Sequence, residues 1–320
     1  MHHKLLPGWG RSPYTRQTPW RVVPSSVAGR CLERTKQYMP RQGRPSEKVA
    51  TSMIKNKRPT VADLRALKGR RVLSQVLVRS VDEAAAAAEA GIEMITVEEN
   101  NWSPAYRQAA PNAFATVGLS YGVLVTTDEY LRAAFAALRI GADAVYCAAS
   151  VQTIARLYAE GIPVVSHVGL IPSRCTWTGG FRAVGTTASS ALKVWRDVQQ
   201  LESAGAFAVE MEVVPDRVAA AIAKRTSLVL ISMGGGSHCD AQYLFAEDIL
   251  GTHSEHYPRH SKRYRDFKTE YERLQKERVA AFQEFRHDVD SGAYPAAEHC
   301  VRIADAELAS FLSELPTDVG

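Results

Sequence analysis

The feature that most constrains this chain is an alternation of short apolar runs and helical stretches between residues 60 and 250 of its 320 residues. The expected strands are Val72–Val78, Met94–Val97, Ala113–Val117, Ala144–Cys147, Pro163–His167, Phe207–Glu212 and Leu228–Ser232. Most of these runs lack a polar face, as expected of strands covered on both sides. The pattern predicts an α/β fold, a (β/α)8 TIM-type barrel whose eighth strand is not identified. A doubly wound open sheet is the alternative, although no GxGxxG motif follows the first strand.

The charge distribution separates an N-terminal tail from the rest of the chain. Residues 1–58 hold 13 Lys and Arg, two Glu and six Pro, a net charge of +11 against +5 for the whole chain, which leaves −6 for residues 59–320. Such a composition buries too little apolar surface to offset the cost of ordering, so we expect a mobile, dispensable tail. Two explanations of this tail stay open. It is an organelle transit peptide, or the sequence starts upstream of the natural first residue, Met53. Basic charge confined to a tail does not indicate nucleic-acid binding.

Composition also bounds the domains and the compartment. We expect the barrel over residues 59–258 and a helical extension over 259–320, whose charged helix is typical of a solvated surface or an oligomer arm. The five cysteines are dispersed, and residues 1–10 hold no apolar segment of a signal peptide. No run approaches the roughly 18 apolar residues that a membrane helix needs. These features predict a cytoplasmic protein with no membrane partner.

In a barrel of this kind the reactive groups lie at the C-terminal ends of the strands. The candidate residues at these ends are Glu99, Asn100, Tyr146, His167, Glu210, Glu212 and Ser232. Glu210 and Glu212 are two residues apart on one strand and therefore share a face. Two carboxylates require partners or water, so we expect this face at the open mouth, with Glu212 as the chemical group. The alternative for Glu210 is an ion pair with an arginine on an outer helix, and a lone histidine such as His167 can also be structural.

A glycine run, Gly234 to Gly236, follows the seventh expected strand. It lets the backbone approach a ligand closely, which makes His238 a further candidate substrate contact. The alternative is a tight strand-to-helix turn capped by Asp240. The HExxH, P-loop and GxSxG motifs are absent from the sequence.

Motifs in the second half of the chain resemble those of one enzyme family. They are GIPVVSHVGLIP at 161–172, GGFRAVG at 179–185, Glu212-Val213-Val214-Pro215, Gly234–Gly236 with Asp240-Ala241-Gln242, and SGAYP at 291–295 with Glu298 and His299. Together they resemble ketopantoate hydroxymethyltransferase (3-methyl-2-oxobutanoate hydroxymethyltransferase), over about residues 59–300. The resemblance implies a barrel related to those of isocitrate lyase and phosphoenolpyruvate mutase, in a large homo-oligomer.

The resemblance also implies a reaction. Family members add a hydroxymethyl group from 5,10-methylenetetrahydrofolate to the enolate of a 2-oxo acid, 3-methyl-2-oxobutanoate, in pantothenate biosynthesis. A magnesium ion chelates the 2-oxo acid. The family's general base matches Glu212, and its substrate-contacting histidine matches His167.

The sequence departs from the family pattern around the metal. The first metal-binding Asp falls on Glu99 and the second on Gly118, while a Lys and a Glu fall on Tyr146 and Ala148. The connection between the second and third strands is also shortened, which leaves no room for the usual loop and helix. Magnesium requires near-octahedral oxygen coordination, so Glu99 alone predicts weak binding or none.

Three hypotheses remain open from the sequence. The first is an enzyme of the family type acting on a 2-oxo acid, with Glu212 as general base. The second is a divergent, metal-independent barrel enzyme on another carbon acid, in which Tyr146, His167 or Asn100 donates a hydrogen bond to an oxyanion. The third is a catalytically silent paralogue that binds a ligand or a partner.

Overall fold

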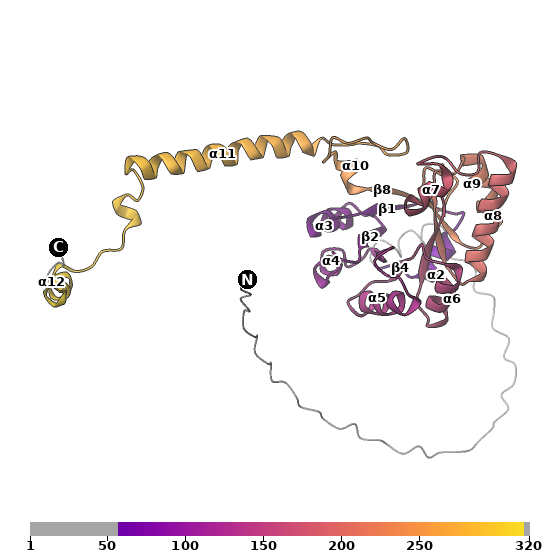
Figure 1. Ribbon diagram of the computed structural model, residues 1–320, viewed down its shortest axis with the longest axis horizontal. Coiled ribbons are helices and arrows are strands. Elements are labelled where there is room, and N and C mark those ends of the chain that lie inside the picture. Colours follow the sequence, from indigo (N-terminus) through magenta and orange to yellow (C-terminus); the bar gives the residue numbers. More distant parts are fainter. Residues whose placement is uncertain (1–56, 317–320) are drawn as a thin grey trace, which may run out of the picture. The chain divides into compact units, whose positions relative to one another are not determined.

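The computed structural model describes residues 57–316, in which eight parallel strands close into a barrel in chain order (Figure 1). The strands are β1 Leu73–Leu77, β2 Met94–Glu98, β3 Phe114–Gly118, β4 Ala144–Tyr146, β5 Val164–Gly169, β6 Ala208–Glu212, β7 Val229–Met233 and β8 Ala241–Phe245. β1 closes the barrel against β8, with Leu73 opposite Ala241. The predicted TIM-type barrel is therefore confirmed.

Five of the helices begin at a Ser or Thr whose side chain caps the first turn. Before the C-terminal extension the helices are α2 Val61–Leu67, α3 Val81–Glu89, α4 Pro104–Ala109, α5 Thr127–Arg139, α6 Val151–Ala159, α7 Cys175–Thr178, α8 Ala188–Ser203, α9 Asp216–Ala223 and α10 Ala246–Leu250, with a 3-10 turn at Pro172–Arg174. In α5, Thr126 and Glu129 form a reciprocal capping box. The buried residues of α5 are Tyr130, Ala134 and Ala137, a spacing of three to four that faces one stripe toward the strands.

The eighth strand corrects the interpretation of the glycine run. Residues 234–240 join β7 directly to β8 without a helix, so Asp240 caps none. Its carboxylate instead accepts hydrogen bonds from the backbone of Leu230 (2.8 Å) and Gly69 (3.0 Å), and it pairs with Lys68 at 2.8 Å. Asp240 therefore ties the entry of β1 to β7, a structural role.

The connection between β2 and β3 also differs from expectation. It holds the short helix α4, although the sequence predicted a connection with no room for the usual loop and helix. Proline at the first helical position suits this helix because the missing N–H would be unpaired in any case. Tyr106 of α4 is buried, and its hydroxyl donates to the backbone oxygen of Arg79 at 2.7 Å. The shortened connection thus still covers its strands.

Two apolar clusters fill the molecule, one between strands and outer helices and one inside the barrel. The inner cluster joins Leu64 and Leu67 of α2 to residues at the N-terminal ends of the strands, including Phe114 and Phe207, whose rings meet edge to face at 5.9 Å. Helix α2 therefore closes the N-terminal end of the barrel with apolar side chains. The opposite end is left for polar groups.

The chain continues into a helical C-terminal segment. It comprises α11 Phe267–Ser291, a 3-10 turn at Ala297–His299 and α12 Asp305–Glu314. None of the 25 residues of α11 is buried, as expected of the predicted charged helix. Among the helices of residues 57–316, none combines the length and the hydropathy that a membrane span requires. The predicted tail lies outside the described residues apart from its last two, and the domain boundaries at residues 58 and 258 stay predictions.

Candidate active site

A cavity of about 430 Å³ opens at the C-terminal end of the barrel. The last residues of several strands line it, among them Leu77, Gly118, Met233 and Phe245. The site residues predicted from the sequence that also line it are Asn100, Tyr146, His167, Glu210 and Glu212. The structure therefore brings most of the predicted residues into one hollow, at the end of the barrel where chemistry is expected.

His167 is the centre of this cluster, because both of its ring nitrogens meet polar groups. Nδ1 lies 2.8 Å from the hydroxyl of Tyr146 and 3.5 Å from Oε2 of Glu210. Nε2 lies 2.7 Å from the backbone oxygen of Leu170 and 3.2 Å from Oε2 of Glu212. The register explains the arrangement, since β5 and β6 place His167 directly opposite Glu210. Glu210 therefore has its partner inside the barrel, rather than the outer arginine that was the alternative.

The two carboxylates favour the charged imidazole. Burial by itself lowers the pKa of His167, but hydrogen bonds and charge from Glu210 and Glu212 outweigh burial and raise this pKa to about 9. Burial raises the pKa of Glu210, and the neighbouring imidazolium opposes that rise. The pKa of the Tyr146 hydroxyl lies well above its ordinary value, chiefly because the group is buried. At neutral pH the cluster therefore holds an imidazolium beside a protonated phenol.

The backbone around Glu212 is unusually constrained. Gly169 at the end of β5 has φ +91°, and a Cβ placed there would lie 2.2 Å from the backbone oxygen of Glu212. Val213, the next residue, has φ +48°, a conformation that β-branched residues rarely adopt. Strain of this kind persists only where the surrounding structure enforces it, and it concentrates at functional sites. Here it fixes the end of β6 that carries Glu212.

Two predicted contacts lie elsewhere. Ser232 lines a neighbouring cavity of about 810 Å³, and its Oγ accepts a hydrogen bond from the backbone N–H of Gly235 at 3.1 Å. His238 is exposed in the loop before β8 and lines neither cavity. The glycine run thus shapes a turn between two strands and does not present His238 to the barrel mouth.

Sequence reasoning missed other polar groups at this end of the barrel. Arg79, just after β1, donates to Glu98 at 2.9 Å and also pairs with Glu247, while Glu98 lines the cavity. Arg79 directly follows the first predicted strand, and the rule that reactive groups end the strands could have identified it. Tyr243 also lines the cavity, and burial and the charge of Glu210 raise the pKa of its phenol. Tyr243 lies on β8, the strand that was not identified from the sequence.

The residues present do not fit a chelated magnesium ion. Glu99, the remaining carboxylate of the expected ligand set, does not line the cavity, and its Oε2 accepts the backbone N–H of Ser120 at 2.9 Å. The second ligand position is Gly118, which has no side chain. Within residues 57–316 no group of three or more His, Cys, Asp or Glu side chains is placed to hold a metal. Magnesium tolerates little departure from octahedral oxygen coordination, so this donor set is inadequate.

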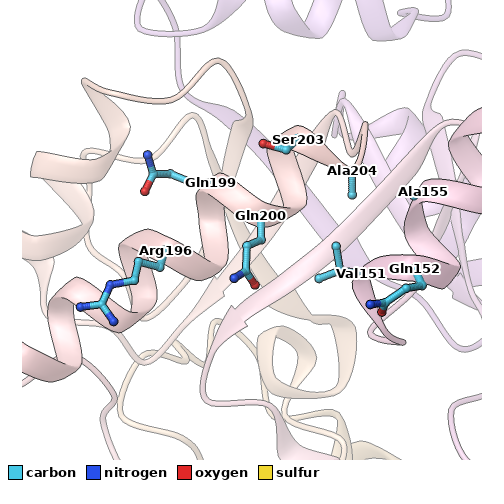
Figure 2. Close-up of a pocket in the computed structure, with 8 residues that line it drawn as sticks. All are labelled: Val151, Gln152, Ala155, Arg196, Gln199, Gln200, Ser203 and Ala204. Carbon is cyan, nitrogen blue, oxygen red and sulfur yellow. The ribbon is translucent and has the colours of Figure 1, made fainter.

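A further hollow lies on the outer helices, away from these groups. Figure 2 shows its lining between α6 and α8, which consists of Val151, Gln152, Ala155, Arg196, Gln199, Gln200, Ser203 and Ala204. Arg196 is the one ionisable side chain among these eight, and none of the predicted site residues is present. The candidate chemical site is therefore the cavity at the barrel mouth, which holds most of the predicted residues.

A (β/α)8 barrel with a buried histidine between two carboxylates at its C-terminal mouth has the fold and the titratable groups of a barrel enzyme. Comparison with known proteins identifies the family. Residues 96–297 match the family described as ketopantoate hydroxymethyltransferase, and the chain belongs to this family of one-carbon transferases.

Curated relatives with this family's name align with the chain over most of their own length. The 3-methyl-2-oxobutanoate hydroxymethyltransferase of Kosmotoga olearia is 32% identical over 256 residues, which cover 72% of this chain and 93% of the relative. That of Thermus thermophilus is 31% identical over 266 residues, covering 76% and 99%. Among solved structures, a phosphoenolpyruvate phosphomutase from Streptomyces platensis subsp. rosaceus aligns with 80% of this chain and 95% of that chain, at 13% identity and a TM-score of 0.43. That level of similarity says nothing about activity.

Proposed function

We propose that this protein transfers a hydroxymethyl group to a 2-oxo acid, with 3-methyl-2-oxobutanoate as substrate, through an enolate for which Glu212 is the general base. The observation that carries the proposal is the position of Glu212. It ends β6 at the cavity, and its Oε2 lies 3.2 Å from Nε2 of His167. Membership of the hydroxymethyltransferase family supports the same reaction class.

The proposed chemistry begins with proton abstraction. Glu212 takes the proton from C3 of the 2-oxo acid, the electron pair forms a C2–C3 double bond, and the carbonyl oxygen gains the negative charge. In the reaction that the family implies, water breaks the two C–N bonds that hold the methylene carbon in 5,10-methylenetetrahydrofolate, tetrahydrofolate leaves, and water supplies the hydroxyl oxygen. C3 then attacks this carbon at the oxidation level of formaldehyde, the C2 carbonyl re-forms, and the new alkoxide takes a proton. His167 places a positive charge beside the base and near the anionic substrate.

A second candidate is a metal-independent barrel enzyme on another carbon acid. It is favoured by one observation, the loss of a magnesium-binding donor set at Glu99 and Gly118. Under either candidate the enolate oxygen requires another partner, because an ion of the family type has no adequate ligands here.

The test is product formation by the full-length protein. We expect hydroxymethyl transfer from methylenetetrahydrofolate to 3-methyl-2-oxobutanoate, followed by mass spectrometry of the product, and loss of transfer in Glu212→Gln. His238→Ala is the matched control and should retain the wild-type rate, because His238 lies outside the cavity. Turnover of other 2-oxo acids alone would favour the second candidate. Binding of 2-oxo acids without turnover would identify a silent paralogue and contradict the proposal.

We also propose that the protein acts as a homo-oligomer. Helix α11 places apolar side chains at spacings of three, four and seven to eight residues, which form one stripe along the helix. They are Tyr271, Leu274, Phe282, Phe285 and Val289, and their exposed fractions run from 39% to 72%. A second copy of the chain, with the same stripe, is a suitable partner for such a surface.

A further inference from the structure

Tyr146 ends β4 at the cavity, and its hydroxyl reaches His167. The hydroxyl oxygen lies 2.8 Å from Nδ1 of His167, and the residue lines the cavity at the barrel mouth. Within residues 57–316 this hydroxyl has no other hydrogen-bond partner. Among the described residues the phenol hydroxyl therefore makes one hydrogen bond, and the residue that carries it lines the cavity.

The direction of that one hydrogen bond depends on the charge of His167. When both ring nitrogens carry protons, Nε2–H donates to the backbone oxygen of Leu170, and Nδ1–H donates to the phenol oxygen. The O–H of Tyr146 is then free to donate to a ligand. When the ring is neutral with its proton on Nε2, Nδ1 is an acceptor and the phenol proton is engaged with it instead.

Glu210 favours the first arrangement. Its Oε2 lies 3.5 Å from Nδ1 of His167, on the same side of the ring as Tyr146. A buried carboxylate next to a buried imidazole stabilises the charged ring, and a charged ring can only donate. Glu210 and His167 together thus orient the Tyr146 hydroxyl toward the cavity. The same imidazolium polarises the phenol and makes it a stronger donor.

The base and the donor flank the same imidazole. Glu212 contacts Nε2 and Tyr146 contacts Nδ1, so the two groups lie on opposite sides of the ring at one cavity wall. In the enolate of a 2-oxo acid, the carbon that loses its proton and the oxygen that gains the charge are separated by one atom. A small acid in this cavity can therefore present its C3 to Glu212 and its C2 oxygen to Tyr146.

We propose that Tyr146 is a catalytic residue that donates a hydrogen bond to the enolate oxygen of the bound 2-oxo acid, in the place of a chelated metal ion, and that Glu210 is the positioning residue that keeps this donor free. The proposal rests on the function proposed above. Under this proposal, side chains of the protein stabilise the negative charge of the enolate. A metal ion cannot do so, because Glu99 and Gly118 do not form a metal site.

The protonation of His167 makes the proposal sensitive to pH. The groups that face the ring within the described residues are Tyr146 from β4, Glu210 and Glu212 from β6, and the backbone oxygen of Leu170. The pKa of His167 is raised to about 9, so the ring is charged below this pH and loses its charge as pH rises through it. The donor role of Tyr146 should be lost over the same interval.

The experiment uses oxalate, a planar dianion that resembles the enolate of a 2-oxo acid, and the full-length protein in the presence of EDTA. Oxalate affinity is measured by titration calorimetry for wild type, Tyr146→Phe and Tyr158→Phe. Tyr158 is the matched control, because it is an exposed tyrosine on α6 outside the cavity. We expect Tyr146→Phe to weaken oxalate binding roughly 10- to 100-fold, and the control to bind as wild type does.

Two further measurements separate this role from a structural one. Solvent deuterium exchange at C3 of 3-methyl-2-oxobutanoate should fall roughly 10²- to 10³-fold in Tyr146→Phe, with little change in the apparent KM. Wild-type oxalate affinity should decline as pH rises through about 9, and the midpoint should move to lower pH in Glu210→Gln, because the imidazolium loses its counter-charge. An unchanged midpoint would remove Glu210 from its positioning role.

The outcomes distinguish this proposal from the proposed function. Wild-type exchange that Tyr146→Phe leaves unchanged, or equal oxalate affinity in both proteins, overturns the role of Tyr146 while the function stands. Absence of exchange in wild type, together with oxalate binding that depends on Tyr146, contradicts the function and supports the donor. Exchange abolished by EDTA and restored by magnesium overturns the replacement of the metal.

Discussion

Substitution of Gly169 by alanine tests how tightly the backbone holds the end of β6 that carries Glu212. An L-residue at φ +91° costs about 1–2 kcal/mol by its backbone conformation alone. The new Cβ would also lie 2.2 Å from the backbone oxygen of Glu212 and 2.7 Å from Cγ2 of Val214, which forces a shift of β6 against β5. Overpacking of this kind costs about 1–3 kcal/mol more. We therefore expect a loss of about 2–5 kcal/mol in the free energy of unfolding, or roughly 5–15 °C in Tm.

Gly161→Ala is the matched control, because Gly161 has φ +77° but nothing lies within 4 Å of its added Cβ. It should lose only the conformational part, about 1–2 kcal/mol. Chemical and thermal unfolding of both variants, with the exchange assay on the folded proteins, measures the difference. If Gly169→Ala is as stable as Gly161→Ala to within about 0.5 kcal/mol and exchanges at the wild-type rate, the close approach at Gly169 does not constrain Glu212.

Two other predictions concern the metal and the assembly. Titration calorimetry with magnesium, in the absence of substrate, should show no stoichiometric site of micromolar affinity, because Glu99 is engaged with Ser120 and Gly118 has no ligand; a micromolar site that disappears in Glu99→Ala would show that the donor set had been undervalued. Light scattering should show an oligomer that dissociates when Phe282 and Phe285 of α11 are both replaced by serine, since the change removes the centre of the apolar stripe; a monomeric wild type would contradict the assembly.

The sequence was sufficient for the barrel because parallel strands covered on both faces leave continuous apolar runs. Seven such runs were visible, and each became a strand at nearly the expected bounds. β8 was missed because it carries the polar Gln242 and follows β7 after only residues 234–240, with no intervening helix to mark it. Gln242 is exposed on this strand and its amide donates to the backbone oxygen of Gly236 at 2.9 Å, so its polarity is satisfied without a buried partner.

The sequence predicted where along the strands the site residues lie, but not which of their side chains contact each other. The rule that reactive groups end the strands located Glu212, His167 and Tyr146, because it needs only the strand ends. Which residues touch depends on register, and the pairing of His167 opposite Glu210 is set by how β5 and β6 align in three dimensions. The sequence alone therefore left Glu210 open between an outer arginine and the barrel interior.

The role proposed for Glu212 is the removal of a proton from C3 of a 2-oxo acid in the barrel-mouth cavity. Its most direct test is proton NMR of 3-methyl-2-oxobutanoate in deuterium oxide, with catalytic amounts of wild type or Glu212→Gln. The amide fills the same space but cannot accept a proton, so a folded Glu212→Gln protein should lose exchange by at least about 10²-fold. Wild type should exchange the C3 proton well above the buffer rate. Exchange by Glu212→Gln at the wild-type rate, in a protein with an unchanged melting temperature, would contradict the account.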